Sequence, residues 1–332
     1  MIIGIDAVGI CIGGGATILC ELVPGLIAAR PDWTIHLFVL PRADREFDDP
    51  QASPRLHVHY IRGASTFVGR MRWVNFRLPG IASELGFDGV FAFANIGNLR
   101  LETKQVIYCQ QALAVGKVAL KKRSVLGDLR ITILHRLIRR SARASKAVVV
   151  QTETMRRSLI QSLPLLESRI KVIPAGVRTV DEHSPLRPEV VELLNRASRP
   201  RILFISTLYP HKNHAKLIEA MARLRDHHPT ATLLLTIPAA RELKALAKQF
   251  GIQGSVYFVG SLSSREIDYA LKNSDVMAYP SVAESFGLPV VEALAVGCPV
   301  AVSDLPYAHE TASDAGTYFD PMDAVSIAHA LD

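Results

Sequence analysis

Short runs of β-branched and aliphatic residues alternate with longer helical patterns along the whole chain. The runs lack strict polar–apolar alternation, as expected for parallel strands that are covered on both faces. Strands that alternate with helices at this spacing predict doubly wound α/β units. We expect strands at 2–6, 34–40, 56–61, 89–93, 105–109 and 147–151, and again at 202–206, 232–237, 256–259, 276–279 and 300–303.

The alternation pauses between residues 175 and 200, where Pro185, Pro188 and Pro200 stand among mostly polar residues. We interpret this stretch as an inter-domain connection that carries a short helix at 189–196. A length of 332 residues fits about two domains. The sequence therefore predicts one domain over 1–174 and a second over 175–332.

Composition describes a globular chain: 49% of the residues are hydrophobic and 21% are charged. No apolar run reaches the ~18 residues of a membrane helix. The first residues resemble a strand and lack the basic region and cleavage site of a signal peptide. The cysteines have no metal-ligand spacing, which indicates a reducing compartment and a cytoplasmic location. They are Cys11, Cys20, Cys109 and Cys298.

The formal net charge is +7, which favours an anionic partner such as a nucleotide, an anionic membrane or a nucleic acid. Basic residues concentrate in 117–146, where Asp128 is the one acid and apolar residues recur at helical spacing. This predicts a basic amphipathic helix. Its charged face is either simply solvated or docks on anionic lipid head groups. We expect no nucleic-acid binding, because no recognised motif or aromatic interleaving accompanies the charge.

Two carboxylates, Glu284 and Glu292, flank a segment that contains Phe286, Gly287, Leu288 and then Pro289. Proline suits the first turn of a helix, so a strand, a short loop and a helix N-terminus are predicted here. The free N–H groups of that terminus can bind a phosphate. Glu284 is expected on the loop and Glu292 in the first turn. Carboxylates accept hydrogen bonds from sugar hydroxyls, although Glu292 could also serve only the helix dipole.

This segment resembles the E-x7-E signature of the retaining GT-B glycosyltransferases, in particular glycosyltransferase family 4. The resemblance implies two Rossmann-like domains that face a central cleft, with the C-terminal domain binding the donor. It also implies that Glu284 contacts the transferred sugar and Glu292 the ribose hydroxyls. Phe286, Gly287 and Leu288 then belong to the donor site.

Lys212 follows the strand predicted at 202–206, at the end where α/β proteins bind ligands. An ammonium group there can neutralise a diphosphate leaving group. Asn213 is expected to cap the next helix. The segment is similar to the family's Pro-x-Lys-Asn stretch, but Thr207 and His211 stand where many relatives have arginine. Protonated His211 is one substitute for the missing cation.

In the first domain, Gly14 and Gly15 come between the first strand and a helical pattern, and their backbone can approach an anion closely. The spacing departs from the G-x-G-x-x-G fingerprint and argues against a nicotinamide enzyme. The resemblance implies that these glycines face the donor diphosphate; a flexible turn is the alternative. It places Gln110, where relatives often have histidine, on the acceptor side as a hydrogen-bonding group. It places Ser261 near the base of the nucleotide.

No D-x-D pair follows a strand, so we predict transfer without a metal or any other cofactor. The resemblance implies a retaining transfer of a hexose from a nucleotide-diphosphate sugar, with Glu284 and Lys212 as catalytic residues. A GDP-mannose-like donor is favoured, with a glycan or lipid-linked acceptor in polysaccharide biosynthesis. The alternatives are a non-catalytic scaffold subunit and a non-hydrolysing nucleotide-sugar epimerase. Because the sequence stops at Asp332 inside a predicted helix, we expect a truncated chain or a shortened tail.

Overall fold

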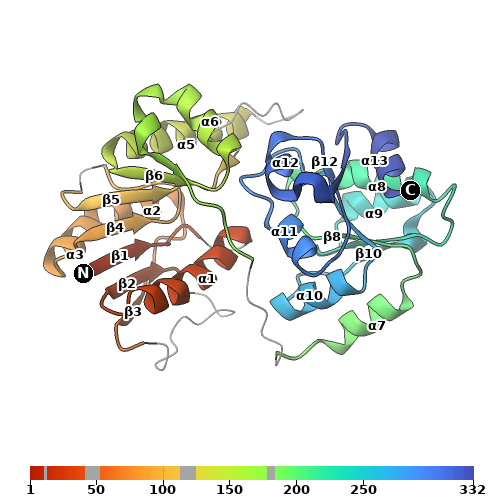
Figure 1. Ribbon diagram of the computed structural model, residues 1–332, viewed down its shortest axis with the longest axis horizontal. Coiled ribbons are helices and arrows are strands. Elements are labelled where there is room, and N and C mark those ends of the chain that lie inside the picture. The colour runs from red at the N-terminus through yellow and green to blue at the C-terminus, as the bar shows by residue number, and fades with distance from the viewer. Residues whose placement is uncertain (11–12, 42–52, 100, 113–124, 178–183) are drawn as a thin grey trace. The chain divides into compact units, whose positions relative to one another are not determined.

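The computed structural model describes residues 1–10, 13–41, 53–99, 101–112, 125–177 and 184–332, with the side chains of 125–131 left out. The chain divides into two compact units, Met1–Gly176 and Val177–Asp332, hereafter the N-terminal and C-terminal units (Figure 1). The boundary predicted after residue 174 lies two residues before the observed one.

The N-terminal unit is built on a seven-stranded parallel sheet with the order β3-β2-β1-β4-β5-β6-β7. The strand order reverses between β1 and β4, the kind of point at which open α/β sheets bind ligands. The strands are β1 (Ile2–Asp6), β2 (Thr34–Val39), β3 (Leu56–Tyr60), β4 (Gly89–Ala92), β5 (Lys104–Tyr108), β6 (Ala147–Val150) and β7 (Ile170–Val172). The helices are α1 (Gly14–Ala29), α2 (Phe67–Arg72), π-helix η1 (Trp73–Arg77), α3 (Leu78–Glu84), α5 (Val125–Ala144), α6 (Glu153–Ser162) and η2 (Pro164–Arg169).

Both faces of this sheet are buried. Leu37 belongs to the apolar cluster that contains Leu19 and Val23 of α1. Its neighbour Phe38 belongs to a separate cluster with Trp73. Because successive side chains of a strand point to opposite faces, the adjacent pair shows that helices cover the sheet on two sides. The prediction from continuous apolar runs is therefore confirmed.

The C-terminal unit holds a six-stranded parallel sheet with the order β10-β9-β8-β11-β12-β13 (Figure 1). One continuous apolar cluster forms its core. The strands are β8 (Arg201–Phe204), β9 (Thr232–Leu235), β10 (Val256–Phe258), β11 (Val276–Tyr279), β12 (Val300–Ser303) and β13 (Gly316–Phe319). The helices are α7 (Pro188–Arg196), η3 (Pro210–Lys212), α8 (His214–Leu224), α9 (Arg241–Gln249), η4 (Gln253–Ser255), α10 (Ser264–Lys272), α11 (Leu288–Ala295), α12 (Pro306–Ala312), η5 (Ser313–Ala315) and α13 (Ala324–Leu331).

All the predicted strands are present, with ends that shift by one or two residues. Two further strands, β7 and β13, were not predicted. Each lies at the edge of its sheet and spans three or four residues, including the polar Lys171 and Thr317. An edge strand pairs on one side only, so it needs a less continuous apolar run than a central strand.

The basic amphipathic helix predicted within 117–146 corresponds in part to α5. Ile138 of this helix is buried, and Leu134 and Leu137 pack against the same apolar cluster. Arg136 and Arg140 are exposed on its other side. The basic residues at 117 and 121–123 lie outside the described residues. In the described part of the chain, no helix combines the length and the apolar character needed to cross a membrane.

Candidate active site

The loop between β11 and α11 carries the first predicted carboxylate. Gly287 ends this loop in the left-handed region with φ 88°, a conformation that a side chain would strain. Helix α11 then begins at Leu288, with Pro289 in its first turn as predicted. Glu284 lies on the loop, also as predicted, while Phe286 and Leu288 turn into the protein and are buried.

Glu292 does not lie in the first turn. Helix α11 starts at Leu288, so Glu292 is the fifth helical residue, and the first turn contains no acid. The start of the helix is set by the left-handed Gly287, one residue earlier than the proline suggested. The Glu292 side chain is 6% exposed, which places a carboxylate at the edge of the core.

The structure brings Lys212 and Glu284 together. Lys212 ends the short turn η3, which follows β8, and its Nζ lies 2.5 Å from Glu284 Oε1. Each side chain is 12% exposed. The same Nζ donates to the Tyr279 hydroxyl at 3.0 Å. The two proposed catalytic residues therefore form a nearly buried ion pair, an arrangement that the sequence did not predict.

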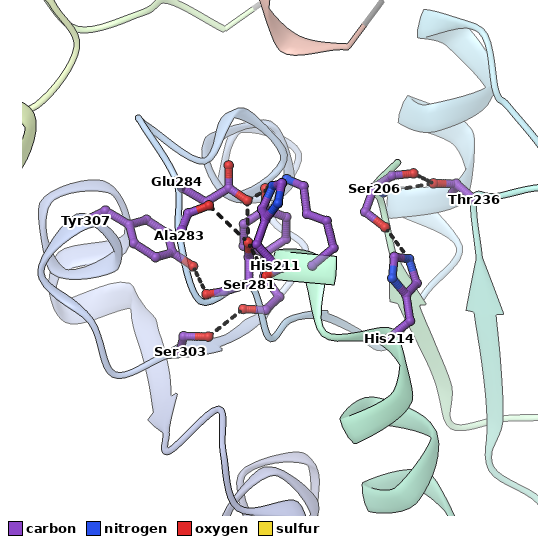
Figure 2. Close-up of polar contacts among 11 residues, drawn as sticks. Ser206, His211, His214, Thr236, Ser281, Ala283, Glu284, Ser303 and Tyr307 are labelled. Atoms are coloured by element: carbon purple, nitrogen blue, oxygen red, sulfur yellow. Dashed lines mark hydrogen bonds and ion pairs between the residues drawn. The ribbon is translucent and has the colours of Figure 1, made fainter. Parts of the chain in front are cut away.

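Neutral hydroxyl groups surround this ion pair. Ser281 Oγ donates to Glu284 Oε1 at 2.5 Å and lies 3.2 Å from the His211 carbonyl oxygen (Figure 2). The Tyr307 hydroxyl donates to the Ser281 carbonyl at 2.8 Å. Burial, reinforced by the charge of Glu284, raises the pKa of both Tyr279 and Tyr307 well above the usual value. Both phenols therefore stay protonated and contribute dipoles rather than charge.

Asn213 stands at the N-cap of α8, but its side chain does not cap the helix, so that prediction is wrong. The residue has φ 62° and ψ 33°, whereas a capping residue is normally extended. Its Nδ2 donates instead to the Pro321 carbonyl at 2.6 Å. The amide thus ties the start of α8 to the segment before α13.

A second polar group, not predicted from the sequence, lies at the end of β8. Ser206 Oγ is 2.8 Å from His214 Nε2, and Thr236 Oγ1 accepts from the Ser206 backbone N–H at 3.0 Å (Figure 2). Burial, together with the charges of Lys212 and His211, lowers the pKa of His214 to about 4. His214 is therefore a neutral imidazole at pH 7 that holds the turn next to Lys212.

The other predicted donor residues of this unit lie on the loops that surround the ion pair. Thr207 is half-buried in the segment after β8. His211 stacks on Tyr209 with ring centroids 5.7 Å apart, and its carbonyl accepts from the Val282 N–H at 2.9 Å. This hydrogen bond joins the turn of Lys212 to the loop of Glu284.

Ser261 is exposed, but its carbonyl oxygen accepts from Arg187 Nη2 at 2.7 Å. Arg187 also donates to Glu266, through Nε at 2.6 Å and Nη2 at 3.0 Å. Glu266 forms a capping box with Ser263 at the start of α10. These hydrogen bonds, mainly that of Arg187, lower the pKa of Glu266 to about 2.

In the N-terminal unit, Gly14 and Gly15 form the first turn of α1 and not a loop before it. The left-handed Gly13 precedes them with φ 76°. A Cβ added to Gly15 would come within 2.8 Å of Gln110 Oε1. Gln110 is fixed, since its Nε2 donates to the Phe93 carbonyl at 3.1 Å. The glycines and the glutamine that were predicted separately therefore lie side by side.

Asp6, at the carboxyl end of β1, is a buried acid that the sequence did not single out. Its Oδ1 accepts from Trp73 Nε1 at 3.1 Å and from the Val8 N–H at 3.3 Å. Burial raises the pKa of Asp6, and the positive charge of Arg70 opposes that rise. The sequence offered one signal for it, an acidic residue at the end of an otherwise apolar strand. That strand, β1, lies where the strand order of the sheet reverses.

Among the residues that the structure describes, no group of three or more His, Cys, Asp or Glu side chains could hold a metal ion. Metal-independent transfer stays a prediction, because a metal can also enter with a substrate.

Two family models match this chain. The model described as Glycosyltransferase Family 4 matches residues 12–181, and the model for group 1 glycosyl transferases matches residues 189–332. Among similar proteins, the O-antigen chain mannosyltransferase RfbU of Salmonella typhimurium is 24% identical over 59% of this chain and 52% of its own length. A D-inositol 3-phosphate glycosyltransferase of Mycobacterium sp. strain KMS is 32% identical over 56% of this chain and 44% of its own length. The chain spans about half the length of the curated relatives it matches.

Solved structures resemble the whole chain. WaaG, a glycosyltransferase involved in lipopolysaccharide biosynthesis, superposes with a TM-score of 0.74 at 18% identity and covers 100% of this chain and 90% of its own. HepE of Anabaena, solved with UDP-glucose, has a TM-score of 0.72 at 20% identity over 99% of this chain and 87% of its own. With the two parallel sheets, these likenesses confirm the predicted GT-B fold.

Proposed function

The chain belongs to glycosyltransferase family 4, and from this premise we propose that it transfers a sugar from a nucleotide-diphosphate sugar with retention of the anomeric configuration. The observation that carries the proposal is the Lys212–Glu284 pair, 2.5 Å apart, on the loops that lead into α8 and α11. A cation, a carboxylate and a helix N-terminus then belong to neighbouring loops. In a complex with a sugar diphosphate, the lysine can neutralise the phosphate charge and the carboxylate can accept from the sugar hydroxyls. The N–H groups of the helix can donate to the phosphate oxygens.

In the proposed reaction, the bond between the anomeric carbon and the phosphate oxygen breaks, and its electron pair leaves with the nucleoside diphosphate. Lys212 and the N–H groups at the start of α11 stabilise the charge that develops on that phosphate. Glu284 orients the sugar hydroxyls and stabilises the oxocarbenium character of the ring. The acceptor hydroxyl attacks from the face of the leaving group and gives its proton to the departing phosphate.

Glu292 is proposed to accept hydrogen bonds from the ribose hydroxyls. Its position in the second turn of α11 fixes its backbone, and the residue is 6% exposed. Gly287, Phe286 and Leu288 shape the turn that precedes it. Thr207, His211 and Ser261 complete the proposed donor site, with His211 supplying a second positive charge when it is protonated.

The names of the relatives support a choice of donor and acceptor. Two of them are O-antigen chain mannosyltransferases, from Salmonella typhimurium and Escherichia coli. We therefore favour a GDP-mannose-like donor and a glycan or lipid-linked acceptor in polysaccharide biosynthesis. The roles expected of Gly14, Gly15 and Gln110 toward the diphosphate and the acceptor stay predictions from the resemblance.

The exposed arginines of α5 support a peripheral contact with an anionic membrane, because basic side chains beside a packed apolar stripe suit lipid head groups. The cytoplasmic location expected from the sequence stays part of this proposal.

A thermal-shift panel of GDP-, UDP-, dTDP- and ADP-linked sugars, each with a divalent ion and with a chelator, tests the proposal. A ligand present at about 100 times its dissociation constant stabilises the folded state by about 2.7 kcal/mol. For a unit of this size, that corresponds to a rise of roughly 5–10 °C. We expect one base to produce this shift with and without metal, and its sugar to be transferred by the wild type but not by Glu284→Gln.

The other outcomes separate the alternatives. The absence of any shift at millimolar ligand would favour the non-catalytic scaffold. Conversion of the donor without an acceptor would favour the epimerase. A shift and a transfer reaction that both require magnesium or manganese would contradict metal independence.

A further inference from the structure

Lys212 and Glu284 bind one another directly in the structure. Glu284 Oε1 accepts from both Lys212 Nζ and Ser281 Oγ, each at 2.5 Å. The two charges are nearly desolvated and cancel one another. A lysine that neutralises Glu284 does not present its full charge to an incoming diphosphate. The ammonium group must therefore move away from Glu284 before it can do so.

Tyr279 contacts the same ammonium group in two ways. Its hydroxyl accepts from Lys212 Nζ at 3.0 Å, and Nζ lies 5.2 Å from the centre of its ring. Tyr279 is completely buried and ends the central strand β11. A phenol that stays neutral accepts from a lysine whether or not Glu284 shares that lysine.

The backbone around Tyr279 is fixed by two more buried residues. Ser303 Oγ donates to the Tyr279 carbonyl at 3.3 Å. The Tyr307 hydroxyl donates to the Ser281 carbonyl (Figure 2). Lysine, by contrast, has a flexible four-carbon stem and three N–H donors. Tyr279 is thus the rigid partner of Lys212, and Glu284, on its loop, is the exchangeable one.

We propose that Tyr279 is a positioning residue: its hydroxyl holds Lys212 while the ammonium group turns from Glu284 to the diphosphate of the donor. Glu284 keeps its hydrogen bond from Ser281 and becomes free to accept from the sugar. The inference rests on the proposed function, since the donor supplies the anion. It adds a residue that touches no substrate and acts through Lys212, and also through Glu284, which the same phenol hydrogen-bonds.

Tyr279→Phe tests this, because it removes the hydroxyl and keeps the ring. The loss of one hydrogen bond to a charged group corresponds to a change of about ten-fold or more. We expect kcat/KM for the donor to fall by that factor, because Lys212 faces the diphosphate both in the bound donor and in the transition state. Tyr307→Phe is the comparison, because it removes another buried phenol hydroxyl that supports the same loop without contacting Lys212. The loss in Tyr279→Phe beyond that in Tyr307→Phe measures the contact with Lys212.

A second measurement does not depend on activity. The rate at which an amine-reactive ester acylates Lys212 is followed by peptide mass spectrometry, with and without GDP or UDP. We expect the rate to be several-fold higher in Tyr279→Phe than in the wild type and clearly less raised in Tyr307→Phe. We also expect the nucleotide that binds to protect Lys212 in the wild type and to protect it less in Tyr279→Phe.

The outcomes distinguish this inference from the proposed function. If a nucleotide protects Lys212 but Tyr279→Phe reacts and turns over like the wild type, the positioning role is wrong and the donor site stands. If the two tyrosine variants behave alike in both assays, Tyr279 is a structural residue only. If neither nucleotide protects Lys212 in the wild type and no sugar is transferred, the donor assignment is wrong. The proposed movement of Lys212 from Glu284 to the diphosphate is then wrong as well.

Discussion

Replacing Glu266 with glutamine should destabilise the C-terminal unit at neutral pH. The Glu266 carboxylate is 2% exposed and accepts hydrogen bonds from Arg187 and from the Ser263 backbone N–H. Its pKa falls from 4.5 to about 2 in the folded protein. This difference corresponds to about 3 kcal/mol of stability. Because Arg187 is 52% exposed, solvent screening reduces the expected loss to about 2 kcal/mol.

The assay is urea unfolding of the full chain at pH 7, with hydrogen exchange of α10 peptides to assign the change to this unit. Urea unfolding gives the free energy directly. In a thermal scan of the same variants, a loss of about 2 kcal/mol lowers the melting temperature by roughly 4–8 °C. Glu242→Gln is the matched control, since Glu242 also lies in the first turn of a helix, α9, but is exposed. Any effect of the helix dipole is then common to both variants, and the control should change by less than about 0.5 kcal/mol.

The sign of the pH dependence gives a second check. A carboxylate with a lowered folded pKa stabilises the protein fully above its unfolded pKa, and the stabilisation is lost as the pH falls toward the folded value. The difference between wild type and Glu266→Gln should therefore be constant above pH 5 and shrink between pH 4.5 and about 2. Equal stability of the two variants at pH 7, or a difference that does not shrink in acid, would refute this reasoning.

Three further predictions concern the candidate site. Glu292→Ala should raise the dissociation constant of the nucleotide about ten-fold, since it removes a charged acceptor of hydrogen bonds; unchanged affinity in calorimetry would contradict the ribose assignment. Gly15→Ala should impair transfer, because its Cβ would come within 2.8 Å of Gln110 Oε1; Gly25→Ala, in the same helix with nothing within 4 Å, should not, and equal activities would argue against the role of Gln110. The pKa of His214 is lowered to about 4, so its contribution to stability is complete above pH 6.5 and is lost as the pH falls toward 4, by up to about 3 kcal/mol. An assigned His214 signal that titrates near 6.5 in NMR spectra of the folded chain would contradict this.

The sequence predicted the central strands because their apolar runs are continuous. The neighbours Leu37 and Phe38 are both buried, on opposite faces, and only a doubly covered strand requires that. The edge strands β7 and β13 have no such requirement and were missed. Propensity also failed at Asn213: asparagine favours the N-cap, but the left-handed backbone there turns its amide toward Pro321.

For the candidate site, residue types were easier to predict than distances. Lys212 and Glu284 were singled out on separate segments, and no spacing rule places residues 72 positions apart at 2.5 Å. Tyr279 and Ser281 were not singled out, because a tyrosine or serine at the end of a strand is common in any core. Glu292 was misplaced because the start of α11 depends on the φ of Gly287.

The strand order of the C-terminal unit has a consequence for its biosynthesis. β11, which leads to Glu284, inserts between β8 and β12, so the turn of Lys212 is translated long before its neighbours. At about 5–20 residues per second, the ribosome needs roughly 4–14 s to add the 72 residues between Lys212 and Glu284. Through that interval the ammonium group lacks Glu284, and until β11 is made β8 can pair only with β9. A nucleotide therefore cannot assist the early folding of the nascent chain and can stabilise only the nearly completed unit.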